Sequence, residues 1–249
     1  MTQETYTPGH TSNATDFMAK RSLESHGGFF RDYLHPNLTV LDCGCGPGSI
    51  TLGIGRAVAP GRVVGADFGA SQIEQAKRAA QEANLGNVQF VAASCYSLPF
   101  PDASFDRIFS HALVEHLAEP RKAFAEFHRV LKPGGCIGAC SPDWDGFVLT
   151  PPSAELSSAI AVYRNLQNAN GGDVAVGKKL GKYLEAAGFN SIRMQARYEC
   201  YPDRTLIGEY LAQQLAAKGE PVHAETLRQW SHRDTGLFAQ AWVSAVGRK

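Results

Sequence analysis

Short apolar runs rich in β-branched residues alternate with alanine-rich stretches over the first part of the chain. The apolar runs predict five strands, at residues 39–43, 62–67, 88–93, 105–110 and 136–141. The stretches between them predict helices at 49–59, 70–83 and 120–131. Strands that alternate with helices predict a parallel sheet with helices on both faces.

After residue 141 the pattern changes, and Pro151-Pro152 breaks the chain. The remaining stretches predict helices at 153–168, 176–187, 204–218 and 222–231, and strands at 192–200 and 237–246. The last strand fits antiparallel pairing. We therefore predict an α/β fold: a Rossmann-like three-layer sandwich with a seven-stranded, mostly parallel sheet, an antiparallel final strand, and a lid of N-terminal and inserted helices.

The composition excludes several classes of protein. Hydrophobic residues make up 44% of the 249 residues, which excludes a disordered chain. Lys+Arg and Asp+Glu number 24 each, so the formal net charge is zero and nucleic acid is not expected as the main partner. No apolar run is long enough to cross a membrane, and the polar first residues lack the pattern of a signal peptide. We expect a cytoplasmic protein without a membrane partner.

The six cysteines do not form a C-x-x-C pair, so we expect buried cysteines and no metal. The main signal is the glycine-rich run VLDCGCGPG at residues 40–48, between the first strand and its helix. The second strand ends at Asp67, where a carboxylate can accept hydrogen bonds from ribose hydroxyls. The dinucleotide pattern G-x-G-x-x-G fails, because Ser49 or Thr51 stands at its last glycine. These features predict a nucleoside site without a pyrophosphate cradle.

The D-x-G-x-G-x-G spacing of residues 42–48 resembles the cofactor loop of class I S-adenosylmethionine-dependent methyltransferases, in the group with ubiquinone, menaquinone and other small-molecule methyltransferases. Further motifs match in the family's order: LPFPDASFD at 98–106, HALVEHL at 111–117, RVLKPGG at 129–135 and LEAAGF at 184–189. The resemblance implies S-adenosylmethionine as cofactor, S-adenosylhomocysteine as its product, and a methyl acceptor as substrate.

The resemblance also implies roles for single residues. The methionine end of the cofactor lies on the glycine-rich loop, at Asp42, Gly44, Cys45, Gly46 and Gly48. Asp67 binds the ribose and Phe68 lies against the adenine. Ser94 and Cys95 occupy the adenine-edge position, although many relatives have Asp where this chain has Ser94. Ser110 and His111 border the methyl group.

Methyl transfer is an in-line displacement that needs a base only when the acceptor must lose a proton. His111 is the leading candidate base, with Asp143 second, and the alternative for His111 is a packing role beside the cofactor. Glu115 and His116 are either structural or part of the site, and His116 and Trp144 are candidate substrate contacts.

Aromatic residues supply the remaining candidates for the acceptor site. Tyr6 and His10 are candidate substrate contacts in a segment that covers the cofactor, or they belong to a disordered tail. A second set lines an acceptor cavity or belongs to the core: Tyr198, Tyr201, Tyr210 and Trp230.

We expect one domain over residues 1–249, with a cover segment at 1–36, a cofactor-binding half at 37–141, and a substrate-side half at 142–249 that carries a helical insertion at 203–233. The expected activity is methyl transfer to O, N or C of a small, partly apolar metabolite, by a monomer or homodimer. The alternatives are a methyltransferase acting on protein or RNA and a protein that binds S-adenosylmethionine without chemistry. A nicotinamide-dependent reductase is disfavoured by the glycine pattern.

Overall fold

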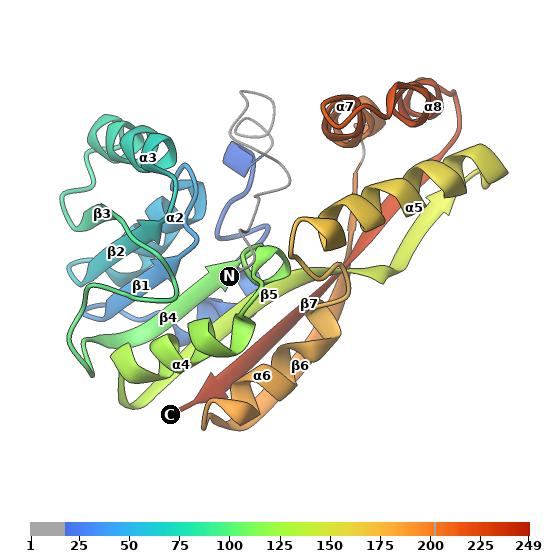
Figure 1. Cartoon of the computed structure of the whole chain (residues 1–249). Helices are drawn as coiled ribbons and strands as arrows, with labels where there is room; N and C mark the ends of the chain where they lie inside the picture. The colour runs from blue at the N-terminus through green and yellow to red at the C-terminus, as the bar shows by residue number, and fades with distance from the viewer. Residues whose placement is uncertain (1–17, 202) are drawn as a thin grey trace.

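The computed structural model describes residues 18–201 and 203–249, and its centre is a seven-stranded sheet with the order β3-β2-β1-β4-β5-β7-β6 (Figure 1). Only β7 runs antiparallel to its neighbours. The predicted mostly parallel sheet with an antiparallel final strand is therefore confirmed. The strands are β1 Thr39–Cys43, β2 Arg62–Asp67, β3 Val88–Ala92, β4 Phe105–His111, β5 Leu131–Thr150, β6 Asn190–Cys200 and β7 Leu237–Arg248.

The α-helices begin where the sequence supplies a start signal. Pro120 opens α4 (Pro120–Val130) and Pro221 opens α8 (Pro221–Ser231), at positions where the missing N–H has no helical partner. The side chains of Ser153 and Asp203 cap α5 (Ala154–Ala169) and α7 (Arg204–Ala216). The others are α2 Ser49–Val58, α3 Ala70–Glu82 and α6 Leu180–Ala186, with short 3-10 helices η1 Gly28–Tyr33, η2 Val114–His116 and η3 Gly177–Lys179.

Two hydrophobic cores form the layers on the sheet. Neighbouring residues of β4 point to opposite faces, so Ile108 packs with α4 and α6 while Phe109 packs with α2 and η1. The second of these cores includes Leu23 and Phe30. Part of the expected cover segment is therefore a structural layer, which the sequence did not indicate.

A third hydrophobic cluster forms a helical roof beyond the sheet. Here β5 and β7 continue as an antiparallel arm to the pair Thr150–Leu237, with a register shift between Asp143 and Val148. Helices α5, α7 and α8 pack on this arm around Trp144 and Phe238, and the arm is visible as the extended part of β5 in Figure 1. The arm continues past the pair His111–Cys140, where β4 ends, so the roof lies at the carboxyl ends of the parallel strands, where open α/β sheets bind their ligands.

Two element predictions were wrong in extent. The predicted strand 136–141 is only the middle of β5, because Pro142, Asp145 and Gly146 are typical of a loop unless an antiparallel partner pairs with them. The predicted helix 176–187 is divided into η3 and α6. No helix in the described part of the chain is long and apolar enough to cross a membrane.

Candidate active site

The glycine-rich turn joins β1 to α2 with a backbone that favours glycine. Gly44, Gly46 and Gly48 have φ angles of 77°, 52° and 86°. A Cβ atom on Gly48 would lie 2.9 Å from both Ala76 Cβ and Phe90 Cζ, so Gly48 lets the turn pack against neighbouring elements. A Cβ atom on Gly46 would have Met18 Sδ as its nearest described neighbour, at 3.8 Å. Gly46 is therefore the position of the turn that a ligand can approach.

Asp67 ties this turn to the next helix. Its Oδ2 accepts a hydrogen bond from Gly46 N (2.9 Å), and its Oδ1 accepts one from Gly69 N (2.8 Å). Each carboxylate oxygen keeps a further lone pair, so the group can still accept hydrogen bonds from a ligand's hydroxyls. The next side chain, Phe68, is 83% exposed, which gives the same edge of the sheet an uncovered aromatic ring.

Asp42 is almost fully buried at the end of β1, and its Oδ2 accepts a hydrogen bond of 2.6 Å from Thr51 Oγ1. Burial raises the pKa of Asp42 to about 7, because a charged carboxylate loses solvation there. A nearby ligand cation would favour the ionised form. This suits Asp42 to an ammonium group, and ligand binding would then be favoured as the pH rises toward neutrality.

The raised pKa of Asp42 predicts how stability depends on pH. Because its folded pKa lies above the unfolded value, Asp42 stabilises the fold at low pH, and this contribution is lost as pH rises through about 4 to about 7. The free energy of unfolding of the wild type should fall between about pH 5 and about pH 8, and we expect it to fall less in Asp42→Asn. Urea denaturation at both pH values measures it, with the exposed Asp234→Asn as control. An equal loss in Asp42→Asn and wild type would contradict the buried-acid assignment.

The cysteines near the turn serve the fold. Cys45 is buried, its N–H donates to Ala66 O at 3.1 Å, and its thiol points to Gly46 O at 3.6 Å. Burial raises the pKa of the Cys45 thiol well above its usual range. Cys95 is buried in the core that contains Ile108. The structure thus gives the Cys45 and Cys95 side chains packing roles, and a cofactor contact from either residue stays a prediction.

Ser94 and Ser110 are placed differently from each other. Ser94 Oγ accepts a hydrogen bond from Tyr96 N at 3.2 Å, so its hydroxyl supports a local turn. Ser110 is buried at the end of β4, and its Oγ has no hydrogen-bond partner among residues 18–201 and 203–249. A buried, unmade hydrogen bond costs free energy, which is consistent with a hydroxyl that awaits a ligand.

His111 is a buried, uncharged ring in an aromatic stack. It lies 4.6 Å from the Trp242 ring centroid with a 20° interplanar angle, and His26 meets it edge-on at 5.3 Å. Neither ring nitrogen of His111 has a hydrogen-bond partner in the described part of the chain. Burial, helped by the charge of Arg21, lowers the pKa of His111 well below its usual range. The ring is therefore a poor proton acceptor near neutral pH, which disfavours the predicted base role and favours packing.

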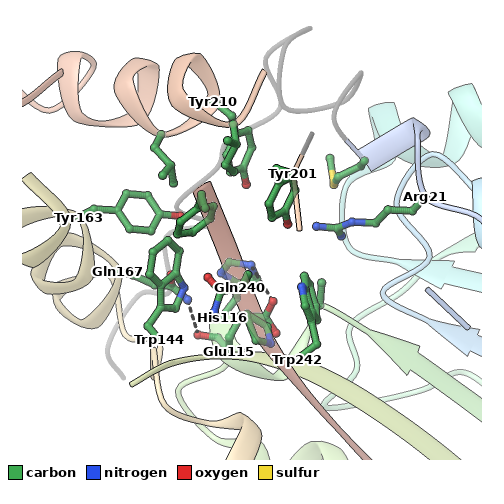
Figure 2. Close-up of a pocket in the computed structure, with 16 residues that line it drawn as sticks. Arg21, Glu115, His116, Trp144, Tyr163, Gln167, Tyr201, Tyr210, Gln240 and Trp242 are labelled. Carbon is green, nitrogen blue, oxygen red and sulfur yellow. Dashed lines mark hydrogen bonds and ion pairs between the residues drawn. The ribbon is translucent and has the colours of Figure 1, made fainter. Parts of the chain in front are cut away.

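A pocket lies under the roof, next to the ends of β4 and β5 (Figure 2). Its walls are largely aromatic: Trp144 lies 5.0 Å from Tyr163 and 6.0 Å from Phe238, measured between ring centroids. The lining residues are Met18, Arg21, Ala112, Glu115, His116, Pro142, Trp144, Tyr163, Gln167, Tyr201, Ile207, Tyr210, Leu211, Phe238, Gln240 and Trp242.

The polar part of the pocket is built around Glu115. The Ser141 hydroxyl donates to Glu115 Oε2 at 2.9 Å, and His116 Nε2 lies 3.8 Å from Glu115 Oε1. Burial raises the pKa of Glu115 to about 7 and lowers the pKa of His116 to about 3. His116 is therefore neutral at physiological pH, while Glu115 can gain or lose a proton there.

The structure places some of the predicted substrate contacts in the pocket lining and others outside it. Trp144 and His116 line the pocket, as do Tyr201 and Tyr210 from the aromatic set. Tyr198 does not, because it is 56% exposed on the edge strand β6. Trp230 is also absent from the lining, since it is buried in the roof with its Nε1 donating to Thr150 O. Tyr6 and His10 lie outside the described residues.

Asp143 is absent from the lining of this pocket, and its catalytic role stays a prediction. The side chain is buried, with Oδ1 accepting from Asp145 N at 3.0 Å and Oδ2 accepting from Lys178 N at 3.2 Å. The carboxylate braces the backbone where β5 enters the arm. Among the described residues, no cluster of three His, Cys, Asp or Glu side chains suits a metal ion.

Sequence reasoning missed a second set of lining residues. Gln240 and Trp242 lie two positions apart on β7 and so point to the same face of the sheet. A glutamine within the apolar run at 237–246 was the available signal. Arg21 places its guanidinium 5.5 Å from the Trp242 ring centroid. Tyr163 and Gln167 come from α5, whose apolar spacing predicts only a packed helix.

Comparison with known proteins agrees with this geometry. A family model described as a methyltransferase domain matches residues 41–138, which include the glycine-rich turn, Asp67 and the whole of β4. An uncharacterized methyltransferase of Schizosaccharomyces pombe is 27% identical over 248 residues, covering 95% of this chain and 88% of the relative. Residues 41–138 therefore match a methyltransferase domain, and this match and the relative support the class I S-adenosylmethionine-dependent methyltransferase family.

Other members of the family match over a shorter part. The probable methyltransferase ltbC of Aspergillus luteorubrus is 34% identical, covering 53% of this chain, and the demethylmenaquinone methyltransferase of Listeria welshimeri is 32% identical, covering 43%. The match spans about half the length of these two relatives, 50% and 48%.

Solved structures show the same fold. The YcgJ protein of Bacillus subtilis has a TM-score of 0.64 at 20% identity and covers 89% of this chain and 97% of its own. The phosphoethanolamine N-methyltransferase 2 of Haemonchus contortus, solved with phosphomonomethylethanolamine and S-adenosylhomocysteine, has a TM-score of 0.59 at 16% identity. It covers 86% of this chain and 49% of its own.

Proposed function

We propose that this protein transfers a methyl group from S-adenosylmethionine to a small, partly apolar acceptor. The observation that carries the proposal is the position of the glycine-rich turn and Asp67 at the sheet edge where the roof also forms an aromatic pocket. The two features supply the two sites that methyl transfer needs, one for the donor and one for the acceptor.

The residues at the turn fit the cofactor. The open side of Gly46 admits close approach of a ligand, and Asp67 is placed for ribose hydroxyls. Phe68 offers its exposed ring to the adenine, and Asp42 offers a buried carboxylate to the ammonium. Ser110 and His111 lie at the end of β4, and His111 stacks on Trp242 of the pocket lining. When bound, the cofactor supplies an activated methyl group on a sulfonium centre, so the protein mainly contributes orientation.

The pocket residues orient the acceptor and exclude water from it. Rings from β5, α5 and β7 enclose a largely apolar space, and Arg21 adds its charge from the N-terminal side. Holding two reactants in line can lower a barrier by several kcal/mol, up to about 7–11 in the best models. The roof is thus the part of the fold that selects the acceptor.

A small acceptor is favoured over a protein or RNA. The pocket is covered by α5 and α7, so an acceptor atom must enter a space lined by side chains. The zero formal net charge provides no general attraction for RNA. We also propose that the segment 1–36 covers the cofactor, that residues 37–141 bind the cofactor, and that residues 142–249 bind the acceptor.

Calorimetry tests the cofactor half of the proposal. We expect S-adenosylhomocysteine to bind the full chain and reduced nicotinamide dinucleotide not to bind. Radiolabel from S-adenosylmethionine, incubated with fractionated cell extract, should then pass into small molecules. Absence of S-adenosylhomocysteine binding would refute the proposal, and label found only in macromolecules would refute the small acceptor.

Phe68→Ser separates cofactor binding from folding. Because Phe68 is 83% exposed, we expect the free energy of unfolding to change by less than about 0.5 kcal/mol. Loss of stacking on the adenine should weaken the binding of S-adenosylhomocysteine by about 0.5–1.5 kcal/mol, roughly 2- to 12-fold in affinity. Calorimetry and urea denaturation measure the two effects. Val222→Ser is the matched control, since Val222 is 75% exposed on α8, and it should change neither.

A further inference from the structure

Gln240 presents a hydrogen-bond acceptor with a fixed direction. Its Nε2 donates to Asp143 O at 2.9 Å and to Ala241 O at 3.2 Å. Reversing the amide would set its oxygen against these two carbonyl oxygens, so the orientation is determined. Gln240 Oε1 is buried and has no hydrogen-bond partner among residues 18–201 and 203–249. Since Gln240 lines the pocket, a ligand there can satisfy this oxygen by donating a hydrogen bond.

Glu115 provides a second acceptor in the same pocket. Its side chain is 3% exposed, and its Oε2 accepts a hydrogen bond of 2.9 Å from the Ser141 hydroxyl. His116 Nε2, at 3.8 Å from Oε1, lies beyond hydrogen-bond distance. Figure 2 shows Glu115, His116 and Gln240 together at the base of the pocket, below Tyr163, Tyr201 and Tyr210. The base of the pocket is therefore rich in acceptors, which favours a ligand group that donates.

The walls define the rest of the ligand. Tyr201 stacks on Phe238 at 5.6 Å with a 25° interplanar angle, and Trp144 packs against Tyr163 beside them. Such rings favour offset stacking or edge-to-face contact with another aromatic ring. A flat ring that carries a donor at one edge would satisfy both the walls and the base of the pocket.

Building on the methyl transfer proposed above, we propose that the acceptor is an aromatic ring bearing a hydroxyl group, that the single O–H of this hydroxyl is shared as a three-centre hydrogen bond between Gln240 Oε1 and the Glu115 carboxylate, and that the carboxylate takes the proton. The hydroxyl oxygen forms a bond to the methyl carbon as its O–H bond breaks. The carbon–sulfur bond breaks and its electron pair stays on sulfur. The products are an aryl methyl ether, S-adenosylhomocysteine and protonated Glu115.

Among the described residues that line this pocket, Glu115 is placed to change charge near neutral pH. The groups that face it are Arg21, His116, Cys140 and Tyr210. Burial lowers the pKa of His116 to about 3 and raises the pKa of Cys140 and of Tyr210. Glu115, with its pKa raised to about 7, therefore gains its carboxylate charge as the pH rises through neutrality. A hydroxyl ligand should bind more tightly above that pH.

Matched probes test this assignment on the full chain loaded with S-adenosylhomocysteine. The pairs are phenol and anisole, 1-naphthol and 1-methoxynaphthalene, and 4-hydroxybenzoate and 4-methoxybenzoate, with affinity measured by calorimetry. We expect at least one hydroxyl probe to bind about 10-fold more tightly than its ether, as one buried hydrogen bond predicts. Gln240→Met should reduce this preference, and Glu115→Gln should abolish the increase in hydroxyl-probe affinity between about pH 6 and about pH 8.

The outcomes separate this inference from the proposed function. If S-adenosylhomocysteine binds but no pair shows a hydroxyl preference in the wild type, the aromatic hydroxyl acceptor is wrong and the methyltransferase proposal stands. If the preference is present but unchanged in Gln240→Met, and its pH dependence is unchanged in Glu115→Gln, the assigned residues are wrong. If S-adenosylhomocysteine itself fails to bind, the proposed function fails. Thermal melts of both variants check that they fold.

Discussion

Asp67→Ala is expected to weaken S-adenosylhomocysteine binding by about 10²- to 10⁴-fold. A carboxylate that accepts two ribose hydrogen bonds loses about 1.5–3 kcal/mol for each when it is removed. The same change also frees Gly46 N and Gly69 N, which Asp67 holds at 2.9 and 2.8 Å, so the turn loses its brace. Calorimetry on the purified variant measures the affinity.

Two further variants help to explain a loss of S-adenosylhomocysteine affinity in Asp67→Ala. Asp67→Asn keeps the size of the side chain and one carbonyl oxygen, so it should bind with intermediate affinity. Glu74→Ala, on the exposed face of α3, removes a carboxylate of the same edge whose side chain is 60% exposed, and it should bind like the wild type. An Asp67→Ala protein that binds within about threefold of the wild type, less than one hydrogen bond is worth, would remove Asp67 from the cofactor site.

Gly48→Ala is expected to destabilise the fold by about 2–5 kcal/mol. Its φ of 86° costs an alanine about 1–2 kcal/mol. The new Cβ atom would also lie 2.9 Å from Ala76 Cβ and Phe90 Cζ, and overpacking of this kind costs about 1–3 kcal/mol. Because domains are stable by only about 5–15 kcal/mol, the change is large, and urea denaturation measures it.

Gly219→Ala is the matched control for Gly48→Ala. Gly219 has a similar φ of 81°, but a Cβ atom there would meet nothing within 4 Å. The Gly219→Ala variant should therefore lose only about 1–2 kcal/mol of unfolding free energy, because alanine disfavours this backbone conformation. Equal losses in the two variants would show that packing at Gly48 is not tight, and that the turn is not held in place by α3 and β3.

The cofactor half of the fold could be predicted from the sequence because its signals are local. Strand β1, the glycine-rich turn and α2 follow one another without a break, and Asp67 ends the next strand. In a parallel sheet these strand ends meet at one edge, so their shared site follows from order alone. The predicted bounds of these elements agree with the structure to within one residue.

The acceptor pocket could not be predicted in the same way, because it depends on long-range pairing. Residues 142–150 pair with β7 nearly a hundred positions away, and only that pairing turns a loop-like sequence into an arm. The pairing brings Gln240 and Trp242 beside Glu115 and Trp144. It also directs the Asp143 carboxylate to backbone N–H groups, which the sequence cannot reveal.

His111 shows why residue type alone is insufficient evidence for a base. Its place at the end of β4 was predicted correctly, yet Trp242 stacks on it and burial lowers its pKa. Glu115, four positions later in the chain, has the opposite shift because burial raises the pKa of an acid. Burial thus lowers the pKa of His111, which makes it a weaker base, and raises the pKa of Glu115 toward neutral pH.

A crystal structure of the protein with S-adenosylhomocysteine decides whether the turn and the pocket form one reaction site. We expect the ribose hydroxyls on Asp67, the adenine against Phe68, and the sulfur atom facing the space between Glu115 and Trp144. A ligand bound away from Asp67, or a sulfur atom turned away from the pocket, would contradict the proposed methyl transfer.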